Sequence, residues 1–146
     1  MKTEPEVFSI DDLKKNKTTL WEGVRNYQAR NFMKEMQVND AVLFYHSNSK
    51  PSGVAGLATV YKTAVPDPTQ FDKKSEYYDS KATLTKPIWF CTEVKFKNKF
   101  NNFISLEIIK NDKNLSGMMV VQKGSRLSVQ PVSSTDFEYI YQLGLK

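Results

Sequence analysis

Cysteine and histidine are almost missing from this sequence of 146 residues, which contains only Cys91 and His46. A single cysteine excludes a disulfide within the chain. Together these two residues cannot supply the Cys and His ligand set of a structural zinc site, and no carboxylate-rich calcium loop is present. We therefore expect a protein without a metal site and without a cofactor.

Long apolar runs and glycine-rich loops are also missing. No stretch approaches the roughly 18 apolar residues that span a bilayer, and no apolar signal segment follows Met1. We therefore expect no membrane contact, and a location in the cytoplasm or, in a eukaryote, in the nucleus. Neither a Gly-x-Gly-x-x-Gly sequence nor a P-loop occurs, so no familiar phosphate-binding loop is present. The absence of a nucleophile elbow disfavours a serine hydrolase.

Arginine is scarce: the sequence contains only Arg25, Arg30 and Arg126, and lysine supplies the rest of its positively charged side chains. Two of these arginines lie within residues 21–31, a stretch rich in aromatic and amide side chains. A guanidinium is a planar fork of donors that stacks on flat rings, whereas the lysine ammonium is a flexible point charge. This distribution favours a role in recognition. Structural ion pairs, which also use arginine, remain the alternative.

Length, composition and charge fit one globular domain that meets a polyanion. A chain of 146 residues is long enough to bury a core, and 40% hydrophobic and 25% charged residues are ordinary values. The net charge of +5 and a pI near 9.2 suit nucleic acid as a partner. We expect a single domain spanning residues 1–146 that acts as a monomer.

Two helix starts are predicted in the first third of the chain. Ser9, with Asp12 three residues later, fits a capping box for a short helix. Asn26 fits the N-cap of a longer helix over residues 27–37. The apolar face of that helix comprises Ala29, Phe32, Met33 and Met36. Its free N-terminal backbone donors are suited to an anion or a base carbonyl.

Strands are predicted over residues 41–46, 54–61 and 88–97, with a further short strand over 118–121. Glycine at position 56 predicts close backbone approach or a bulge in the second strand. Residues 67–87 are polar and irregular, and a loop of this length is often functional. We expect this loop to be anchored by its aromatic residues, which are Phe71, Tyr77 and Tyr78.

The C-terminal part adds a short helix over residues 105–110 and an alternating segment over residues 126–132. Thr135 is predicted to open a last helix, which Gly144 ends. Short strands with interspersed short helices predict an α+β fold. Its architecture is expected to be a mostly antiparallel β barrel with short flanking helices.

Aromatic and amide side chains are the candidates for holding a flat ligand such as a nucleobase, by stacking and by hydrogen bonds to its edge. The stacking candidates are Trp21, Tyr27, Tyr45 and Trp89. The candidates for edge contacts are Asn26, Gln28, Asn31, Ser47, Ser128 and Gln130. Arg25, Arg30 and Arg126 could reach a phosphate or a carbonyl. For each aromatic residue, ordinary core packing is the alternative.

Catalysis has one candidate centre, at His46. Its neighbour Ser47 is the next residue of a predicted strand, so the two side chains point to opposite faces and do not pair. Cys91 lies among aromatic residues of a strand and fits a core position. A structural or ligand-contacting histidine is therefore favoured over a catalytic one.

Several motifs, in order along nearly the whole chain, resemble the EVE domain of the PUA-like superfamily. They are Lys2-Thr3-Glu4-Pro5, residues 21–31 (WEGVRNYQARN), Phe44-Tyr45-His46-Ser47, residues 53–58 (GVAGLA), Pro66-Asp67-Pro68, Tyr77-Tyr78-Asp79, Trp89 and residues 126–132 (RLSVQPV). The resemblance implies a PUA-like pseudo-barrel and a pocket for a modified base in DNA or RNA, without catalysis.

Carried over by position, the resemblance implies a pocket rimmed by Lys2, Trp21, Val24, Arg25, Asn26, Tyr27, Tyr45, His46, Ser47, Gln130 and Pro131. The residue patterns add Gln28, Arg126 and Ser128 to this set. Members of the family usually have a short aromatic strand before the equivalent of Lys2. Because this sequence begins at Met1, we expect either that the strand is missing or that the start of the sequence is misassigned. A missing strand would remove one edge of the sheet and one pocket wall.

The sequence therefore leads to a non-catalytic domain that reads a modified base, for example a 5-substituted cytosine or N6-methyladenine. An enzyme acting on RNA or on a nucleotide-like small molecule is the alternative. A small-molecule or protein-interaction domain with an unrelated basic charge is the third possibility.

Overall fold

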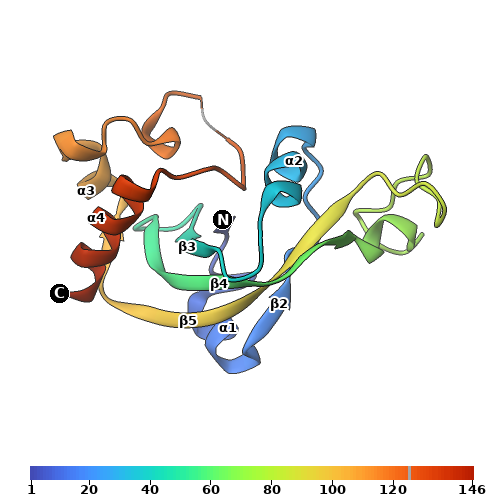
Figure 1. The fold of residues 1–146 in the computed structure, drawn as a ribbon, viewed down its shortest axis with the longest axis horizontal. Coiled ribbons are helices and arrows are strands. Elements are labelled where there is room, and N and C mark those ends of the chain that lie inside the picture. The colour runs from blue at the N-terminus through green and yellow to red at the C-terminus, as the bar shows by residue number, and fades with distance from the viewer. Residues whose placement is uncertain (125) are drawn as a thin grey trace.

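One sheet of five strands, in the order β1-β3-β4-β5-β2, forms the centre of the computed structural model, which describes residues 1–124 and 126–146 (Figure 1). β1 pairs with β3 in parallel, and the other neighbours pair antiparallel. The predicted α+β fold with a mostly antiparallel sheet is therefore confirmed. The strands are β1 (Lys2–Thr3), β2 (Thr18–Leu20), β3 (Ala41–His46), β4 (Gly53–Pro66) and β5 (Phe90–Ser105).

β3 is buried on both faces of the sheet, which explains its nearly continuous apolar sequence. Phe44 belongs to one core cluster, with Met33 of the helix after residue 26. Its neighbours Leu43 and Tyr45 belong to a second cluster on the other face, with Ile140 near the C-terminus. Because side chains alternate along a strand, one short segment contributes to both cores.

β4 and β5 are longer than predicted and bend together across the molecule (Figure 1). Their pairing register shifts at several points, including between Val54 and Gly56. A Cβ atom at Gly56 would lie 2.5 Å from the carbonyl oxygen of Asn98, so the backbones approach too closely for a side chain. The predicted close approach in this strand is confirmed.

Four α-helices surround the sheet: α1 (Ile10–Asn16), α2 (Tyr27–Glu35), α3 (Leu106–Asn111) and α4 (Ser134–Leu145). The capping box of Ser9 and Asp12 and the N-cap at Asn26 are confirmed. Helix α2 ends earlier than predicted, because Met36 has an extended backbone. Among the described residues, no helix is long and apolar enough to cross a membrane.

Three predictions in the C-terminal part were wrong. Residues 119–121 form a 3-10 turn, η3 (Met119–Val121), in place of a strand. Helix α4 is capped by Ser133, whose hydroxyl accepts from the N–H of Asp136, rather than by Thr135. Gly144 lies within α4 and does not end it. A Cβ atom there would lie 2.3 Å from the Phe100 ring, so this glycine serves close packing of α4 on β5.

Helices α3 and α4 lie at one end of the bent sheet, and the loop between β4 and β5 extends from the other end (Figure 1). This loop, called the 67–89 loop below, begins with the 3-10 turn η1 (Pro68–Phe71). Helix α2 lies between the two ends. The N-terminal end of α2 is preceded by residues 21–26, which connect β2 to the helix.

Candidate functional site

A cavity of about 710 Å³ opens beside Trp21, and we call it the Trp21 cavity. Its walls come from residues of the segments 2–8, 19–26 and 126–128, and from Tyr77 of the 67–89 loop. The predicted site residues that it brings together are Lys2, Trp21, Val24, Arg25, Asn26, Arg126 and Ser128. Segments far apart in the sequence thus meet at one opening.

Trp21 forms a rigid part of this cavity, with only 8% of its surface exposed. Its backbone N–H donates to the carbonyl of Thr92 over 2.9 Å, and its ring packs edge-on against Phe44 with 5.6 Å between centroids. Within the described parts of the chain, every fully buried side-chain nitrogen or oxygen has a hydrogen-bond partner. The indole N–H of Trp21 has no partner among the described residues, so it is not one of these fully buried atoms. Trp21 is also one of the residues that line the cavity.

Asn26 is fixed by its role at the start of α2. Its Oδ1 accepts from the N–H of Ala29 over 2.9 Å, as an N-cap does. No partner of its Nδ2 group is found among the described residues. The cap therefore orients the side chain and leaves two N–H groups available to a ligand.

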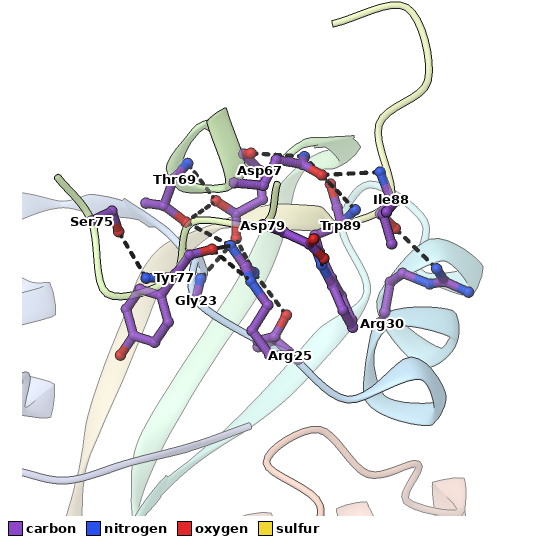
Figure 2. Close-up of polar contacts among 12 residues, drawn as sticks. Gly23, Arg25, Arg30, Asp67, Thr69, Ser75, Tyr77, Asp79, Ile88 and Trp89 are labelled. Atoms are coloured by element: carbon purple, nitrogen blue, oxygen red, sulfur yellow. Dashed lines mark hydrogen bonds and ion pairs between the residues drawn. The ribbon is translucent and has the colours of Figure 1, made fainter. Parts of the chain in front are cut away.

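Arg25 has a structural role at the wall of the cavity. Its Nε and Nη2 donate to the carbonyl of Tyr77, Nη2 also donates to Thr69, and Nη1 donates to Asp67 and to the carbonyl of Val24 (Figure 2). These bonds use all the N–H groups that a guanidinium has. For Arg25, the structure therefore favours the ion-pair alternative that the sequence left open, and no donor remains for a ligand.

The carboxylate of Asp67 is the buried partner of this arginine and is only 1% exposed. It accepts from the N–H of Gly23 over 2.8 Å and from the N–H of Thr69 over 2.8 Å. Burial raises the pKa of Asp67, but the hydrogen bonds from Thr69, Gly23 and Arg25 outweigh it and hold the pKa below its usual value. This charged contact ties the 67–89 loop to the segment that follows Trp21.

Gln70 holds the base of the same loop, and sequence reasoning missed it. Its side chain is completely buried. Nε2 donates to the carbonyls of Asp67 and Trp89, and Oε1 accepts from the N–H groups of Ile88 and Trp89. These four bonds satisfy the amide. Phe71, Tyr77 and Tyr78 were predicted as anchors. Tyr77 does anchor the loop, because its carbonyl accepts from Arg25 and its ring packs over Gly23, although Tyr77 and Tyr78 are each 38% exposed.

Trp89 and Tyr27 stack on each other outside the Trp21 cavity. Their ring centroids are 4.9 Å apart, with an angle of 23° between the ring planes. The indole N–H of Trp89 donates to the carboxylate of Asp79 over 2.8 Å. Trp89 lies between Arg25 and Arg30, whose guanidinium carbons lie 5.2 and 5.8 Å from its ring (Figure 2). Arg30 also donates to the carbonyl of Ile88. These residues build the support of the loop.

The remaining predicted residues lie apart from the cavity. Tyr45, Gln130 and Pro131 line a separate cavity of about 40 Å³, which Lys2 and Ser128 also touch. Gln28 lines a shallow hollow next to Asn26 and Arg126. The sequence could not separate these positions, because the two cavities share the segment around residue 128.

His46 and Ser47 have structural contacts near β1. Nε2 of His46 accepts from the N–H of Ile10 over 3.1 Å, and burial lowers the histidine pKa. The N–H of Ser47 donates to the carbonyl of Thr3. The ring nitrogen that would act as a base is therefore engaged.

Tyr77 and Glu22 are cavity residues that were not predicted to belong to the site. The Tyr77 ring stands over Gly23, where an added Cβ would lie 2.8 Å from the ring. Gly23 has φ of +86°, a conformation in which glycine is favoured. Burial, and then the charge of Asp67, raises the pKa of Glu22. The glycine was visible in the sequence, but the tyrosine packed on it was not.

Positive charge at the cavity comes from Arg126. Lys2 also lines the cavity, but its Nζ lies against Tyr45 in the separate cavity, and neither residue forms an ion pair with another described residue. Burial lowers the pKa of Lys2, whose Nζ lies 5.7 Å from the centre of the Tyr45 ring. Within residues 1–124 and 126–146, no group of three His, Cys, Asp or Glu side chains could hold a metal ion. The site thus combines a cation, unpaired donors and aromatic walls.

Comparisons with known proteins show the family and the fold of this chain. The family model of the EVE domain matches residues 1–143. Thymocyte nuclear protein 1 of Gallus gallus is 40% identical over an alignment of 162 positions. The alignment covers 98% of this chain and 66% of that protein. The chain thus spans slightly less than two thirds of that relative.

Two solved structures share the fold over nearly their full length. A protein of Pseudomonas syringae superposes with a TM-score of 0.94 at 45% identity, covering 99% of this chain and 97% of the other. The human THYN1 protein, in complex with DNA containing 5-methylcytosine, superposes with a TM-score of 0.91 at 39% identity, covering 100% and 96%. The predicted PUA-like fold is confirmed, and the chain belongs to the EVE domain family.

Proposed function

We propose that this protein is a non-catalytic reader that binds DNA carrying a modified base, with the base in the Trp21 cavity. The observation that carries the proposal is a cavity walled by the largely buried Trp21 and by side chains with unpaired donors, among them Asn26. The relative whose structure contains 5-methylcytosine DNA supports 5-methylcytosine as the modification.

The cavity is large enough for a nucleobase. Its volume of about 710 Å³ lies within the range of about 300–1,000 Å³ typical of small-molecule sites. Trp21 and Tyr77 supply aromatic surface, and stacking of a base on an aromatic side chain is worth about 1–3 kcal/mol. The Nδ2 group of Asn26 and the hydroxyl of Ser128 can bond the edge of the ring.

A base in this cavity must leave the duplex stack, at a cost of a few kcal/mol. Contacts to the phosphate backbone offset that cost, and they weaken as salt rises. Arg126 lies at the cavity without an ion-pair partner among the described residues, and the chain carries a net charge of +5. The charge therefore supports nucleic acid over a neutral small molecule.

The absence of catalysis is part of the proposal. His46 uses Nε2 to accept a bond from Ile10. Burial raises the pKa of the Cys91 thiol to about 12, so that the reactive thiolate does not form near neutral pH. The enzyme considered as an alternative thus lacks its best base and its only thiol nucleophile. We further propose a monomer located where the DNA is, in the nucleus of a eukaryote or the cytoplasm of a bacterium.

The test is binding to matched duplexes with one central 5-methylcytosine, cytosine, N6-methyladenine or adenine, measured by fluorescence anisotropy. We expect tighter binding to the 5-methylcytosine duplex than to its unmodified match. Tyr77→Ala removes a half-exposed cavity wall and should reduce that affinity at least about fivefold, with little change in the circular dichroism spectrum. Equal binding to modified and unmodified duplexes would refute the proposal.

A matched control variant is Tyr61→Ala, which removes an exposed tyrosine of β4 that does not line the cavity. This variant should bind like the wild-type protein. If Tyr61→Ala and Tyr77→Ala lower the affinity equally, the base does not occupy the Trp21 cavity.

A further inference from the structure

Glu22 is the carboxylate of the Trp21 cavity that has no partner among the described residues. Two other acidic residues near the opening are engaged. Glu4 accepts from Nδ2 of Asn48 over 3.0 Å, and Asp67 is bound by Arg25. Glu22 lines the cavity next to Gly23, over which the Tyr77 ring stands.

A free carboxylate is costly in a site for a polyanion. It repels the phosphates that Arg126 attracts, and although the residue is exposed, partial desolvation still raises its pKa. Such a group becomes favourable when the ligand offers it an N–H, because hydrogen bonds to a charged acceptor are about twice as strong as neutral ones. An ionised carboxylate accepts and cannot donate.

Among the pyrimidines, only cytosine presents an amino group at position 4 of the ring. Thymine and uracil present a carbonyl oxygen there, which a carboxylate repels. Cytosine also carries two acceptors next to that amino group, O2 and N3. The N–H groups of Asn26 and Trp21, both free of described partners, can meet such acceptors. A free carboxylate and several unpaired donors around the cavity are thus the kinds of group that the edge of cytosine requires.

We propose that Glu22 determines base specificity by accepting a hydrogen bond from the amino group of a bound cytosine. The cavity then admits 5-methylcytosine and rejects thymine, which carries the same methyl group. This inference rests on the proposed function, because it assumes that a base occupies the Trp21 cavity.

The experiment compares duplexes with a central 5-methylcytosine, cytosine or thymine opposite an abasic site, so that none of these bases is paired. The wild-type protein should bind 5-methylcytosine about tenfold more tightly than thymine. Glu22→Gln should reduce this ratio to about twofold or less, mainly through tighter binding of thymine. The carboxamide can turn its NH₂ group toward the thymine carbonyl, so this gain is not expected from a merely structural role.

Glu6→Gln is the matched control, because it removes the same charge from an exposed residue near the opening that does not line the cavity. It should change the affinities for all three duplexes by the same factor and leave the ratio intact. Thermal unfolding confirms that both variants fold.

The outcomes separate the two proposals. Wild-type protein that binds thymine as tightly as 5-methylcytosine overturns the role of Glu22, as does Glu22→Gln with an unchanged ratio. Preference for 5-methylcytosine over cytosine in that case leaves the modified-base reader standing. Equal binding of cytosine and 5-methylcytosine with thymine rejected supports Glu22 and refutes the reading of the modification.

Discussion

The guanidinium of Arg25 and the carboxylate of Asp67 lie 3.0 Å apart, although 42 residues separate them in the sequence. Asp67 is 1% exposed and the side chain of Arg25 is 21% exposed. The same carboxylate binds the N–H of Gly23. The pair therefore joins the loop that carries Tyr77 to the segment that carries Trp21.

Asp67→Ala should lower the free energy of unfolding by about 3 kcal/mol, because it leaves the mostly buried Arg25 without its counter-ion. Chemical denaturation measures the change. Asp11→Ala is the control, since its pair with Lys99 has exposed fractions of 65% and 52% and should contribute less than about 1 kcal/mol. Equal effects of the two variants would contradict the structural role of Asp67.

Stability should also fall in acid because of Asp67. Its folded pKa lies below the usual value, so its stabilising effect is complete above the pKa of the unfolded chain, which is about 4. The effect is lost as the pH falls from there through the folded pKa. Denaturation between pH 6 and 3 should show a smaller loss of stability in Asp67→Asn than in the wild-type protein, and an identical loss would count against this assignment.

Gly23→Ala should weaken DNA binding as well as folding. An alanine at φ of +86° costs about 1–2 kcal/mol, and its methyl group would displace the Tyr77 ring, 2.8 Å from the Cβ position. Gly144→Ala provides the comparison, because its methyl group meets Phe100 away from the cavity. It should lower the melting temperature without changing the affinity of the folded protein. Unchanged affinity in Gly23→Ala would show that Tyr77 does not shape the binding site.

Asn26→Ser should separate capping from binding. Serine caps helices as well as asparagine does, so the unfolding free energy should change by less than about 0.5 kcal/mol. Binding should weaken because the Nδ2 donor is lost. Ser133→Ala should do the reverse, since it removes the cap of α4 at a cost of about 1 kcal/mol and leaves the cavity intact. Fluorescence anisotropy and thermal melts on both variants measure the two effects. Unchanged DNA affinity in Asn26→Ser would contradict the binding role of Nδ2.

Arg126→Gln should reduce the salt dependence of DNA binding. Loss of one phosphate contact lowers the slope of log K against log salt concentration by about 0.9. Lys110→Gln removes the same charge from an exposed residue of α3 that does not line the cavity, and it should leave the slope unchanged. A slope that both variants alter equally would indicate a general charge effect without a local contact.

The predictable features depend on neighbours in the sequence. Ser9 and Asn26 could be predicted as caps from residue type and position alone, because an N-cap acts on nearby residues. In the structure each accepts from the N–H three positions later. Residues 41–46 were identified as a strand because apolar residues continue through them. The same reasoning failed at Thr135, since Ser133 is an equally good cap two residues earlier. A local pattern cannot choose between two adjacent competent caps.

The features that could not be predicted depend on contacts between distant residues. In the sequence, Gln70 is an ordinary loop residue. Only the structure shows that its amide bonds both the carbonyl and the backbone N–H of Trp89. Arg25 and Arg126 have the same chemistry in the sequence, but only Arg25 finds a buried carboxylate. Trp21, Val24 and Asn26 share the cavity because they are close in sequence. Lys2 was predicted as a site residue only from the resemblance to the EVE family. Glu22 was not predicted, because its role depends on the cavity that the structure shows.

The ties of the 67–89 loop have a consequence for how such a domain can change. Gln70 and Asp67 secure the base of the loop through bonds to the sheet and to Gly23, whereas Tyr77 projects from its outer part. Residues 72–87 contribute no strand to the sheet. Substitutions or insertions there can remodel one side of the opening while strand pairing and both cores stay intact. The selectivity of the domain can therefore evolve separately from its ability to fold.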